Sequence, residues 1–568
     1  MFNHGFLCRP CGAHTSLYSH PPLTGWARLF RAFARSCGAC LSSLESMLSS
    51  HKPLFYACKV KPATLKLLFS SLFLCLAFSG CAKHPDANTL VMIIESSPTN
   101  LDPRVGTDAQ SERIDQLIFD SLVHRDEHFN IQPWIAERWE IPDPRTYIFH
   151  LRQGIQFHDG RPLTSRDVKW TLDSLRNGSL ITLKATTYRL ISQVDAPDAS
   201  TVIVHLSEPD STLLYNLSEG AFGIVPYGSD KSFSRFPVGS GPFRFVSQEP
   251  DSQVTVERND HYWGAQAHVE RVRFTVVPDA TTRALELRKG SADISPSGSL
   301  SADMIGTLRR DPKLAFEQEP GTVLAYMTFN LRDPILKDVR VRQALAHAIN
   351  RGPMLHYLFG DQGRLADSVL PPQHWAYNGD VAHYDYDPKR ANAMLDAAGY
   401  RRGRDGIRFH LLMKTSTEET TRLLAAVLQQ QLHEVGIALD IRSFEFGTFY
   451  SDVLKGSFQL YSLRWIGGNE DPDIFYYAFH SSSFPPKHAN RGYYVNPEVD
   501  RLIDAGRQTV NQQERKQIYA QLQRILADDL PYINLWYFDN VVVHSQRVKN
   551  LRVNAAGNYD FLTTVELQ

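Results

Sequence analysis

The stretch from Thr146 to Val168, TYIFHLRQGIQFHDGRPLTSRDV, contains the strongest structural signal of this chain. Its first part, Tyr147–Leu151, is rich in aromatic and β-branched residues, which is typical of a β-strand. Gly154 and Gly160 predict turns with positive φ, where a residue without a Cβ is favoured. Phe157 lies between the two glycines and is expected in the core. The stretch therefore predicts a strand followed by a loop that two glycines shape.

A helix is predicted directly after this loop. Pro162 belongs to the loop, and Ser165–Leu175 has helical spacing, with Ser165 and Asp167 offering a cap acceptor and a negative charge in the first turn. Similar patterns predict a strand over Thr201–Leu206 and helices over Val339–Asn350, Pro388–Ala398, Thr420–Glu434 and Gln512–Asp528. This mixture predicts an α/β protein. Because the chain has 568 residues and no evident linker or repeat, we expect several domains built from non-adjacent segments.

Further short motifs flank the first one in a fixed order. They are Ile135–Trp139, Pro237–Phe243, Arg258–Trp263, Asp338–Leu345, Ala348–Arg351, Asp471–Asp473 and Asn496–Asp500. Within them, Gly239 and Gly241 are also predicted to adopt positive φ, and Trp139 is expected in the core. Together the motifs resemble the extracytoplasmic solute-binding proteins of peptide and nickel ABC importers, the family-5 group, over residues 88–568. We expect these motifs to determine the fold rather than to contact the ligand.

The resemblance implies a periplasmic-binding-protein-like fold of type II, with two α/β lobes, a hinge and a small extra domain. The implied division is 1–80 signal region, 81–122, 233–319 and 537–568 lobe I, 123–232 small extra domain, and 320–536 lobe II. The chain would cross between the lobes near Gly321–Asn330 and return near Pro531–Phe538. A ligand would be enclosed between the lobes by hinge closure.

The resemblance also implies where the ligand binds. In peptide-binding members a Trp is followed three residues later by an Asp that binds the ligand's α-amino group; here Trp465 is present and the matching position is Gly468. Thr415 and Ser462 stand near the places where relatives hold a cation for the ligand's carboxylate. The expected ligand-binding residues are Phe446, Trp465, Ile466, Gly467, Gly468 and Asp471.

The missing acid leaves the ligand class open. Glu470 or Asp471 could replace it, or Asp471-Pro472 could be a turn. Because a buried ammonium without a counter-ion is costly, the loss argues against an ordinary short zwitterionic peptide. The main prediction is a peptide or peptide-like solute. The alternatives are a nickel complex, a sugar or another small molecule, or a chaperone-like binding protein of the same fold.

All seven cysteines lie within the first 81 residues. Leu67–Phe78 is an apolar run behind basic residues, too short to span a bilayer, and resembles the core of an export signal. The four residues that end at Cys81, FSGC, resemble a bacterial lipobox, which implies lipidation of Cys81. The alternative is an ordinary signal peptide with Cys81 as an incidental thiol. A cysteine-free remainder suits an oxidising compartment.

Two Cys-x-x-Cys pairs near the start, at Cys8 and Cys11 and at Cys37 and Cys40, invite a zinc interpretation. Their separation is wide for a zinc ribbon, and export would discard the site. We expect instead that translation starts later, for instance at Met47, and that the protein holds no metal and no cofactor.

Charge and motifs exclude other classes of function. Without the eight basic residues and one acidic residue of positions 1–80, the chain has 52 basic and 60 acidic residues, a net charge of −8. Nucleic-acid binding is therefore not expected. The rest of the chain has no Gly-x-Ser-x-Gly, His-Glu-x-x-His or P-loop motif, so no enzyme activity is predicted. The expected partners are ABC permease and ATPase subunits and, through the anchor, a membrane; the protein is expected to be a periplasmic or cell-surface monomer.

Overall fold

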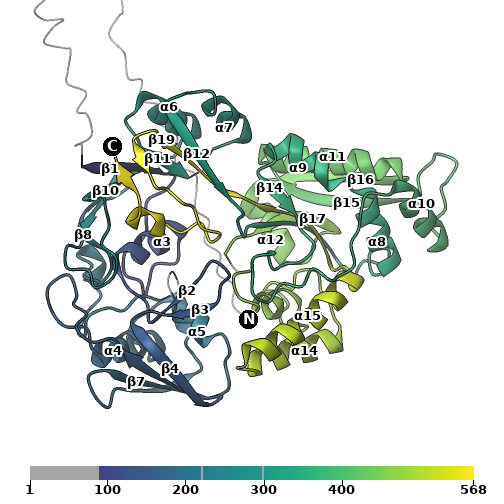
Figure 1. The fold of residues 1–568 in the computed structure, drawn as a ribbon. Helices are drawn as coiled ribbons and strands as arrows, with labels where there is room; N and C mark the ends of the chain where they lie inside the picture. The colour runs from purple at the N-terminus through teal and green to yellow at the C-terminus, as the bar shows by residue number, and fades with distance from the viewer. Residues whose placement is uncertain (1–87, 219, 221, 297–299, 468) are drawn as a thin grey trace, which may run out of the picture. The chain divides into compact units, whose positions relative to one another are not determined.

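The computed structural model describes residues 88–218, 220, 222–296, 300–467 and 469–568, which form a mixed α/β body (Figure 1). Residues 83–568 make up one compact unit of the chain. Cys81, the two Cys-x-x-Cys pairs and Gly468 lie outside the described residues. In the described ranges, no helix is both long and apolar enough to cross a membrane.

The first large sheet has seven strands and defines what we call lobe I. Their order is β12 (Leu314–Glu319), β19 (Asn540–Ser545), β11 (Ile294–Pro296), β1 (Thr89–Ile94), β10 (Arg271–Val276), β9 (Gln253–Arg258) and β8 (Phe243–Glu249). All six residues of β1 are buried, because alternate side chains enter cores on opposite faces of the sheet. Helix α3 (Ala109–Ile118) covers one face, and α6 (Ala280–Lys289) and α7 (Ala302–Leu308) cover the other.

The second large sheet has six strands and defines lobe II. Their order is β14 (Gly363–Leu365), β18 (Tyr532–Phe538), β13 (Leu324–Phe329), β17 (Leu460–Trp465), β15 (Phe409–Ser416) and β16 (Ile437–Phe444). One face packs on α8 (Val339–Ala348), α9 (Arg351–Phe359), α10 (Pro388–Ala397) and α11 (Glu419–Glu434). The other packs on α12 (Phe446–Leu454), α13 (Ile474–Phe479), α14 (Pro497–Gln508) and α15 (Gln512–Asp529). Central β13 is buried along its whole length between these layers.

A smaller antiparallel sheet has the order β4 (Ala136–Asp143), β5 (Thr146–Leu151), β7 (Thr201–Leu206) and β6 (Ile191–Asp195). It has its own core, to which α4 (Ser165–Arg176) and α5 (Leu213–Asn216) contribute. Two further pairs are β2 (Val123–Arg125) with β3 (Ile131–Pro133) and β20 (Val548–Lys549) with β21 (Glu566–Leu567). The 3₁₀ helices are η1 (Leu183–Thr186), η2 (Phe233–Arg235) and η4 (Asp560–Thr563).

Two short connections join the large sheets. The chain passes from β12 to β13 through residues 320–323 and returns from β18 to β19 through Asp539. The connections lie against each other, since the Phe538 amide donates to the Val323 carbonyl at 2.8 Å. A Cβ at Gly321 would come within 2.5 Å of the Phe538 carbonyl oxygen, so this close approach requires glycine.

The predicted elements are largely confirmed. The strand β7 has the predicted bounds, and β5, α4, α8, α10, α11 and α15 differ from their predictions by at most two residues at an end. Gly154 and Gly160 have φ of +82° and +84°, as predicted. The helix cap is Thr164, one residue before Ser165, and its backbone N–H donates to the Asp167 carboxylate at 2.8 Å.

The prediction of positive φ for Gly239 and Gly241 is wrong, since neither residue adopts it. Both glycines are required for another reason. A Cβ at Gly239 would lie 1.9 Å from the Ile118 carbonyl oxygen, and one at Gly241 would lie 2.6 Å from that of Leu117. The backbone of this motif packs directly on the end of α3, so there is no space for a side chain.

Two of the sequence motifs meet at the buried carboxylate of Asp120. Its Oδ1 accepts hydrogen bonds from Trp134 Nε1 at 2.9 Å and from the Tyr262 hydroxyl at 3.0 Å. Its Oδ2 accepts from Ser240 Oγ at 2.8 Å and from Trp263 Nε1 at 3.0 Å. Burial raises the Asp120 pKa, and the four hydrogen bonds oppose that shift. These motif residues therefore hold segments of the fold together.

Candidate functional site

Trp465 stands at the end of β17, inside an aromatic stack of lobe II. The indole is 8% exposed and stacks on Tyr326, with ring centroids 5.6 Å apart and an interplanar angle of 16°. Tyr326 stacks in turn on Tyr532 at 4.6 Å. Because β13, β17 and β18 are neighbours in the sheet, one face of the sheet supplies all three rings. Trp465 thus packs in the core of lobe II, and only a small part of its side chain is exposed.

Exposed apolar side chains surround this stack. Ile466, directly after β17, is 72% exposed, and Tyr477 of α13 is 41% exposed and packs edge-on to Trp465 at 6.0 Å. Phe446 begins α12, is 54% exposed and stacks on Tyr450 at 5.8 Å. We call Phe446, Tyr450, Trp465, Ile466 and Tyr477 the aromatic rim. Exposed aromatic surface of this kind favours ligand contact at a small loss of side-chain entropy.

Arg491 links the two halves of the rim. Its guanidinium carbon lies 5.2 Å from the Trp465 ring centre and 5.4 Å from that of Tyr450. The structure thus brings the predicted residues Trp465 and Phe446 into one chain of contacts. No sequence pattern indicated Arg491, Tyr450 or Tyr326 as site residues. The only available signal was an arginine beside the Gly-Tyr-Tyr turn of residues 492–494.

The loop after Trp465 is held on both sides. Gly467 has φ of +78°, and the fully buried Asn469 side chain donates to the carbonyls of Thr322 at 2.7 Å and Val369 at 3.0 Å. Glu470 forms a buried ion pair with Arg125 of β2, with Nη1 and Oε2 2.7 Å apart. Since Arg125 already neutralises Glu470, this acid is a poor replacement for the missing amino-group receptor.

Asp471 faces a different environment from Trp465. It is 8% exposed, burial raises its pKa, and the charge that most opposes this shift is that of Arg515. Its Oδ1 accepts a hydrogen bond from the Asp473 backbone N–H at 2.8 Å. This geometry is that of an Asx turn, the second of the two interpretations of Asp471-Pro472. The assignment of Asp471 to ligand binding stays a prediction.

Several buried polar atoms near the stack have no hydrogen-bond partner among the described residues. They are Trp465 Nε1, Arg491 Nε and Thr415 Oγ1. Ser462, by contrast, donates to the Tyr326 carbonyl at 2.9 Å. Because most buried polar atoms in proteins are satisfied, such a group of unpaired atoms indicates a place where a polar ligand or water belongs.

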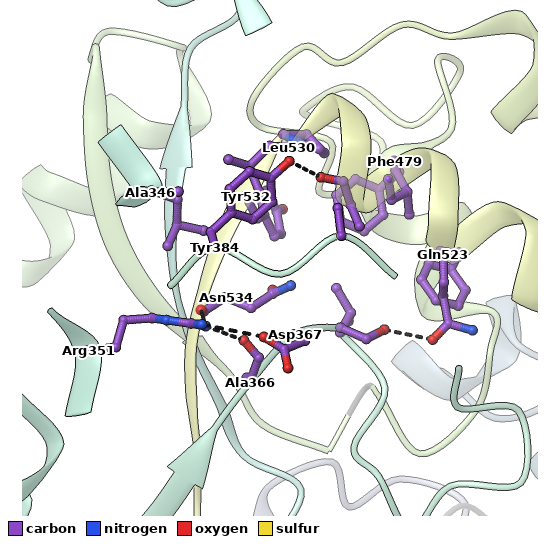
Figure 2. Close-up of a pocket in the computed structure, with 18 residues that line it drawn as sticks. Ala346, Arg351, Ala366, Asp367, Tyr384, Phe479, Gln523, Leu530, Tyr532 and Asn534 are labelled. Atoms are coloured by element: carbon purple, nitrogen blue, oxygen red, sulfur yellow. Dashed lines mark hydrogen bonds and ion pairs between the residues drawn. The ribbon is translucent and has the colours of Figure 1, made fainter. Parts of the chain in front are cut away.

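A separate cavity lies inside lobe II, between β18 and α15 (Figure 2). It comprises about 600 Å³ of atom-free space, part of it open to solvent. Figure 2 shows Arg351 pointing at the carbonyls of Ala366 and Asn534, and its Nη1 lies 2.8 Å from the latter. None of the predicted ligand residues that the structure describes lines this cavity, and Tyr532 joins it to the stack. Within the described ranges, no three His, Cys, Asp or Glu side chains are grouped so that they could hold a metal ion.

The family model of bacterial extracellular solute-binding proteins, family 5 (middle part), matches residues 130–485. The chain belongs to this family. The predicted resemblance is therefore confirmed, and family membership describes the chain as a solute-binding protein.

Individual relatives match this chain over most of its length. The dipeptide-binding protein of Escherichia coli is 28% identical over 533 residues, which cover 88% of this chain and 98% of that protein. Heme-binding protein A of Haemophilus influenzae is 27% identical over 508 residues, 84% of this chain and 92% of the relative. The structure of HbpA2 from Haemophilus parasuis matches with a TM-score of 0.75 and 26% identity, covering 84% of this chain and all of that one. The predicted α/β fold of type II, with two lobes, is thereby confirmed.

Proposed function

We propose that this protein is the substrate-binding component of an ABC importer and that it captures a peptide or peptide-like solute between its two lobes. Family membership supports a binding role, and relatives of similar length are named for dipeptides and for di- and tripeptides. The captured solute would pass to membrane permease and ATPase subunits. In this proposal the chain binds its ligand without chemical change.

The observation that most supports the binding site is the unpaired indole N–H of Trp465. This N–H is buried, belongs to the residue directly before the exposed Ile466, and has no acceptor in the described part of the chain. A peptide carbonyl is a suitable acceptor, and the flat aromatic rim suits the apolar parts of a peptide. Ligand binding would then involve Phe446, Trp465, Ile466 and Gly467, together with Gly468 in the undescribed position beside them.

Closure would occur about the two connections between the sheets. The division proposed for the chain, with lobe II at 320–536 and the small extra domain at 123–232, leaves these connections as the flexible joints. Binding energy would shift the population from an open to a closed form. At 100 times its dissociation constant, a ligand stabilises the native state by about 2.7 kcal/mol.

This proposal is tested with defined peptides by calorimetry and small-angle scattering. Tetra-alanine and its N-acetylated form should bind, raise the melting temperature and reduce the radius of gyration. Binding that stabilises the protein without compaction would favour the chaperone-like alternative. Absence of binding to any peptide of two to about ten residues would contradict the peptide assignment.

A non-peptide solute is the second candidate. It is favoured by Gly468, which stands where peptide-binding relatives carry an Asp, and by the name of the heme-binding relative. Without a carboxylate at that position, a ligand with a blocked or absent amino group would be preferred. Failure of both the free and the acetylated peptide to bind would favour a non-peptide solute over a peptide.

We also propose attachment to the membrane through a lipidated Cys81, in the periplasm or at the cell surface. The sequence before Cys81 supports this, as does the lack of cysteine after it. Two or more acyl chains give stable attachment, where one is marginal. Cys81→Ala should move the protein to the soluble fraction; a variant that still sediments with membranes would contradict the anchor.

A further inference from the structure

Arg491 is a buried cation that the described part of the protein does not neutralise. Its side chain is 7% exposed. Nη1 donates to the Tyr326 hydroxyl at 3.2 Å and Nη2 donates to the Tyr450 hydroxyl at 3.0 Å, while Nε has no acceptor among the described residues. No carboxylate within ion-pair distance of Arg491 is found there. Because arginine does not deprotonate in proteins, its charge stays in the core.

The surrounding phenols cannot supply the missing negative charge. Burial raises the pKa of the Tyr326 and Tyr461 hydroxyls, so both remain neutral at physiological pH. Neutral oxygens accept hydrogen bonds from a guanidinium without cancelling its charge. An unneutralised buried charge costs free energy unless a counter-ion joins it.

Other buried arginines of this protein have carboxylate or backbone carbonyl partners. Arg104 pairs with Asp102 at 2.7 Å, and Arg125 pairs with Glu470 at 2.7 Å. Arg342 donates to the backbone carbonyls of Leu336, Lys337, Asp529 and Leu530. Arg515 donates to the Gly506 carbonyl and interacts with the charges of Asp471 and Asp473. Arg491 differs because, among the described residues, it donates hydrogen bonds to hydroxyl groups alone.

The position of Arg491 is fixed by the turn that carries it. The Asn490 side chain donates to the carbonyls of Phe479, His480 and Tyr494, and its oxygen accepts from the Tyr494 N–H at 2.9 Å. The Leu331 N–H donates to the Gly492 carbonyl at 2.9 Å. A rigid turn therefore directs the guanidinium between Tyr450 and Trp465. The contact of Nη2 with Tyr450 is partly buried and that of Nη1 with Tyr326 is buried, so Nη2 lies on the more accessible side of the guanidinium.

We propose that Arg491 is the receptor for a carboxylate of the ligand, which makes this protein selective for solutes with a free carboxylate and an aromatic-compatible body. The inference rests on the proposed function, since it assumes that the rim around Trp465 receives the ligand. A planar carboxylate matches the guanidinium fork and can take the place of the Tyr450 hydroxyl at Nη2 and engage the unpaired Nε. Arg491 then selects ligands that have a carboxylate. Gly468, which has no acidic side chain, does not select for a free amino group.

The test compares two probes that differ by one charge. The first probe is N-acetyl-tetra-alanine, which has a free C-terminal carboxylate. The second is the same peptide with an amidated C-terminus, which is neutral. We expect calorimetry to give at least about ten-fold tighter binding of the acid than of the amide by wild type. In Arg491→Met the acid should bind no better than the amide. Equal affinities in wild type, or an acid preference that survives in Arg491→Met, would overturn the proposal.

A second measurement does not depend on the peptide. Removing an unneutralised charge should leave the melting temperature of ligand-free Arg491→Met equal to or above that of wild type. Arg342→Met is the matched control, an equally buried arginine with carbonyl partners, and should melt lower. A clear fall for Arg491→Met would make Arg491 a structural residue and overturn its role as a receptor.

If neither peptide binds, the proposed peptide function fails. The role of Arg491 as a carboxylate receptor is then tested with simple anions. Sodium acetate, compared with sodium chloride at equal ionic strength, should raise the melting temperature of wild type and not of Arg491→Met. Stabilisation by inorganic phosphate but not by acetate would overturn the carboxylate assignment, and so would identical responses of the two proteins.

Discussion

Asp120 and Arg491 are both buried charged side chains, but they differ in how many of their polar atoms have hydrogen-bond partners. Asp120 receives four hydrogen bonds from Trp134, Ser240, Tyr262 and Trp263, two at each oxygen. Arg491 has two neutral hydroxyl acceptors and one N–H without a partner in the described chain. A fully satisfied buried charge fixes the fold, whereas an unsatisfied one is maintained at a loss of stability. Such a loss is expected where the group has a binding role.

The difference also separates motif residues from site residues. The motifs that identify family 5 supply three of the four hydrogen-bond donors to Asp120 and the close contacts of Gly239 and Gly241. The five residues of the aromatic rim lie outside those motifs. Family membership is thus encoded mainly in these motifs, whereas in the proposed function ligand choice depends mainly on the aromatic rim.

The largest expected effect is at Asp120, where two of the family motifs meet. Asp120→Ala should reduce the free energy of unfolding by at least about 3 kcal/mol, because it leaves several buried donors without an acceptor. Urea unfolding followed by circular dichroism measures this loss. Ligand affinity of the folded fraction should not change. A stability close to that of wild type would contradict the stabilising role of the Asp120 carboxylate.

His374 offers a second test of a satisfied buried group, this time close to the site. It is 3% exposed, and its Nε2 lies 3.1 Å from the Glu470 carbonyl oxygen. Burial lowers its pKa to about 3, so between about pH 6.5 and 3 the unfolded chain binds a proton that the folded protein does not. The stability from neutral His374 is present above pH 6.5 and decreases as the pH falls, by up to about 1.4 kcal/mol per pH unit.

His374→Gln should therefore lose less stability than wild type between about pH 7 and pH 5, a difference of about 2 kcal/mol. Urea unfolding at both pH values measures it, and the change with pH is compared rather than the absolute stability. Parallel pH profiles of the two proteins would show that His374 titrates normally in the folded state.

A smaller effect is expected at the indole of the rim. Trp465→Phe keeps most of the buried ring and removes the unpaired N–H, so it should weaken ligand binding by about 1–2 kcal/mol with a small change in melting temperature. Trp465→Ala would also weaken binding, but with the side chain only 8% exposed it would lose core packing as well. Unchanged affinity of Trp465→Phe would place the ligand away from the indole N–H.

The smallest effect concerns the amino end. Gly468→Asp restores the acid that peptide-binding relatives carry three residues after the Trp, and should improve binding of tetra-alanine over its N-acetylated form by about 1 kcal/mol. Gly468→Asn is the matched uncharged control. If wild type already binds the free amine much more tightly, another acid makes that contact, and Asp471 would be the first candidate to mutate.

The sequence predicted those features that depend on local patterns. The periodic helix Glu419–Glu434 and the strand Thr201–Leu206 were predicted because their apolar spacing is regular over many residues. Gly239 and Gly241 were misinterpreted, since the contact of a backbone with the end of a distant helix leaves no local trace. The Arg125–Glu470 pair joins residues 345 positions apart, and Arg491 lies in a turn without periodicity, so neither could be predicted from one sequence.

We expect this protein to hold a carboxylate-bearing solute at Arg491, beside Trp465. Native mass spectrometry of freshly purified wild type and Arg491→Met tests it most directly. We predict that wild type carries an additional mass that is released on denaturation and proves to be a peptide or peptide-like molecule with a free carboxylate. The same mass should be absent from Arg491→Met. An identical bound species on both proteins, or a solute without an anionic group, would contradict the account.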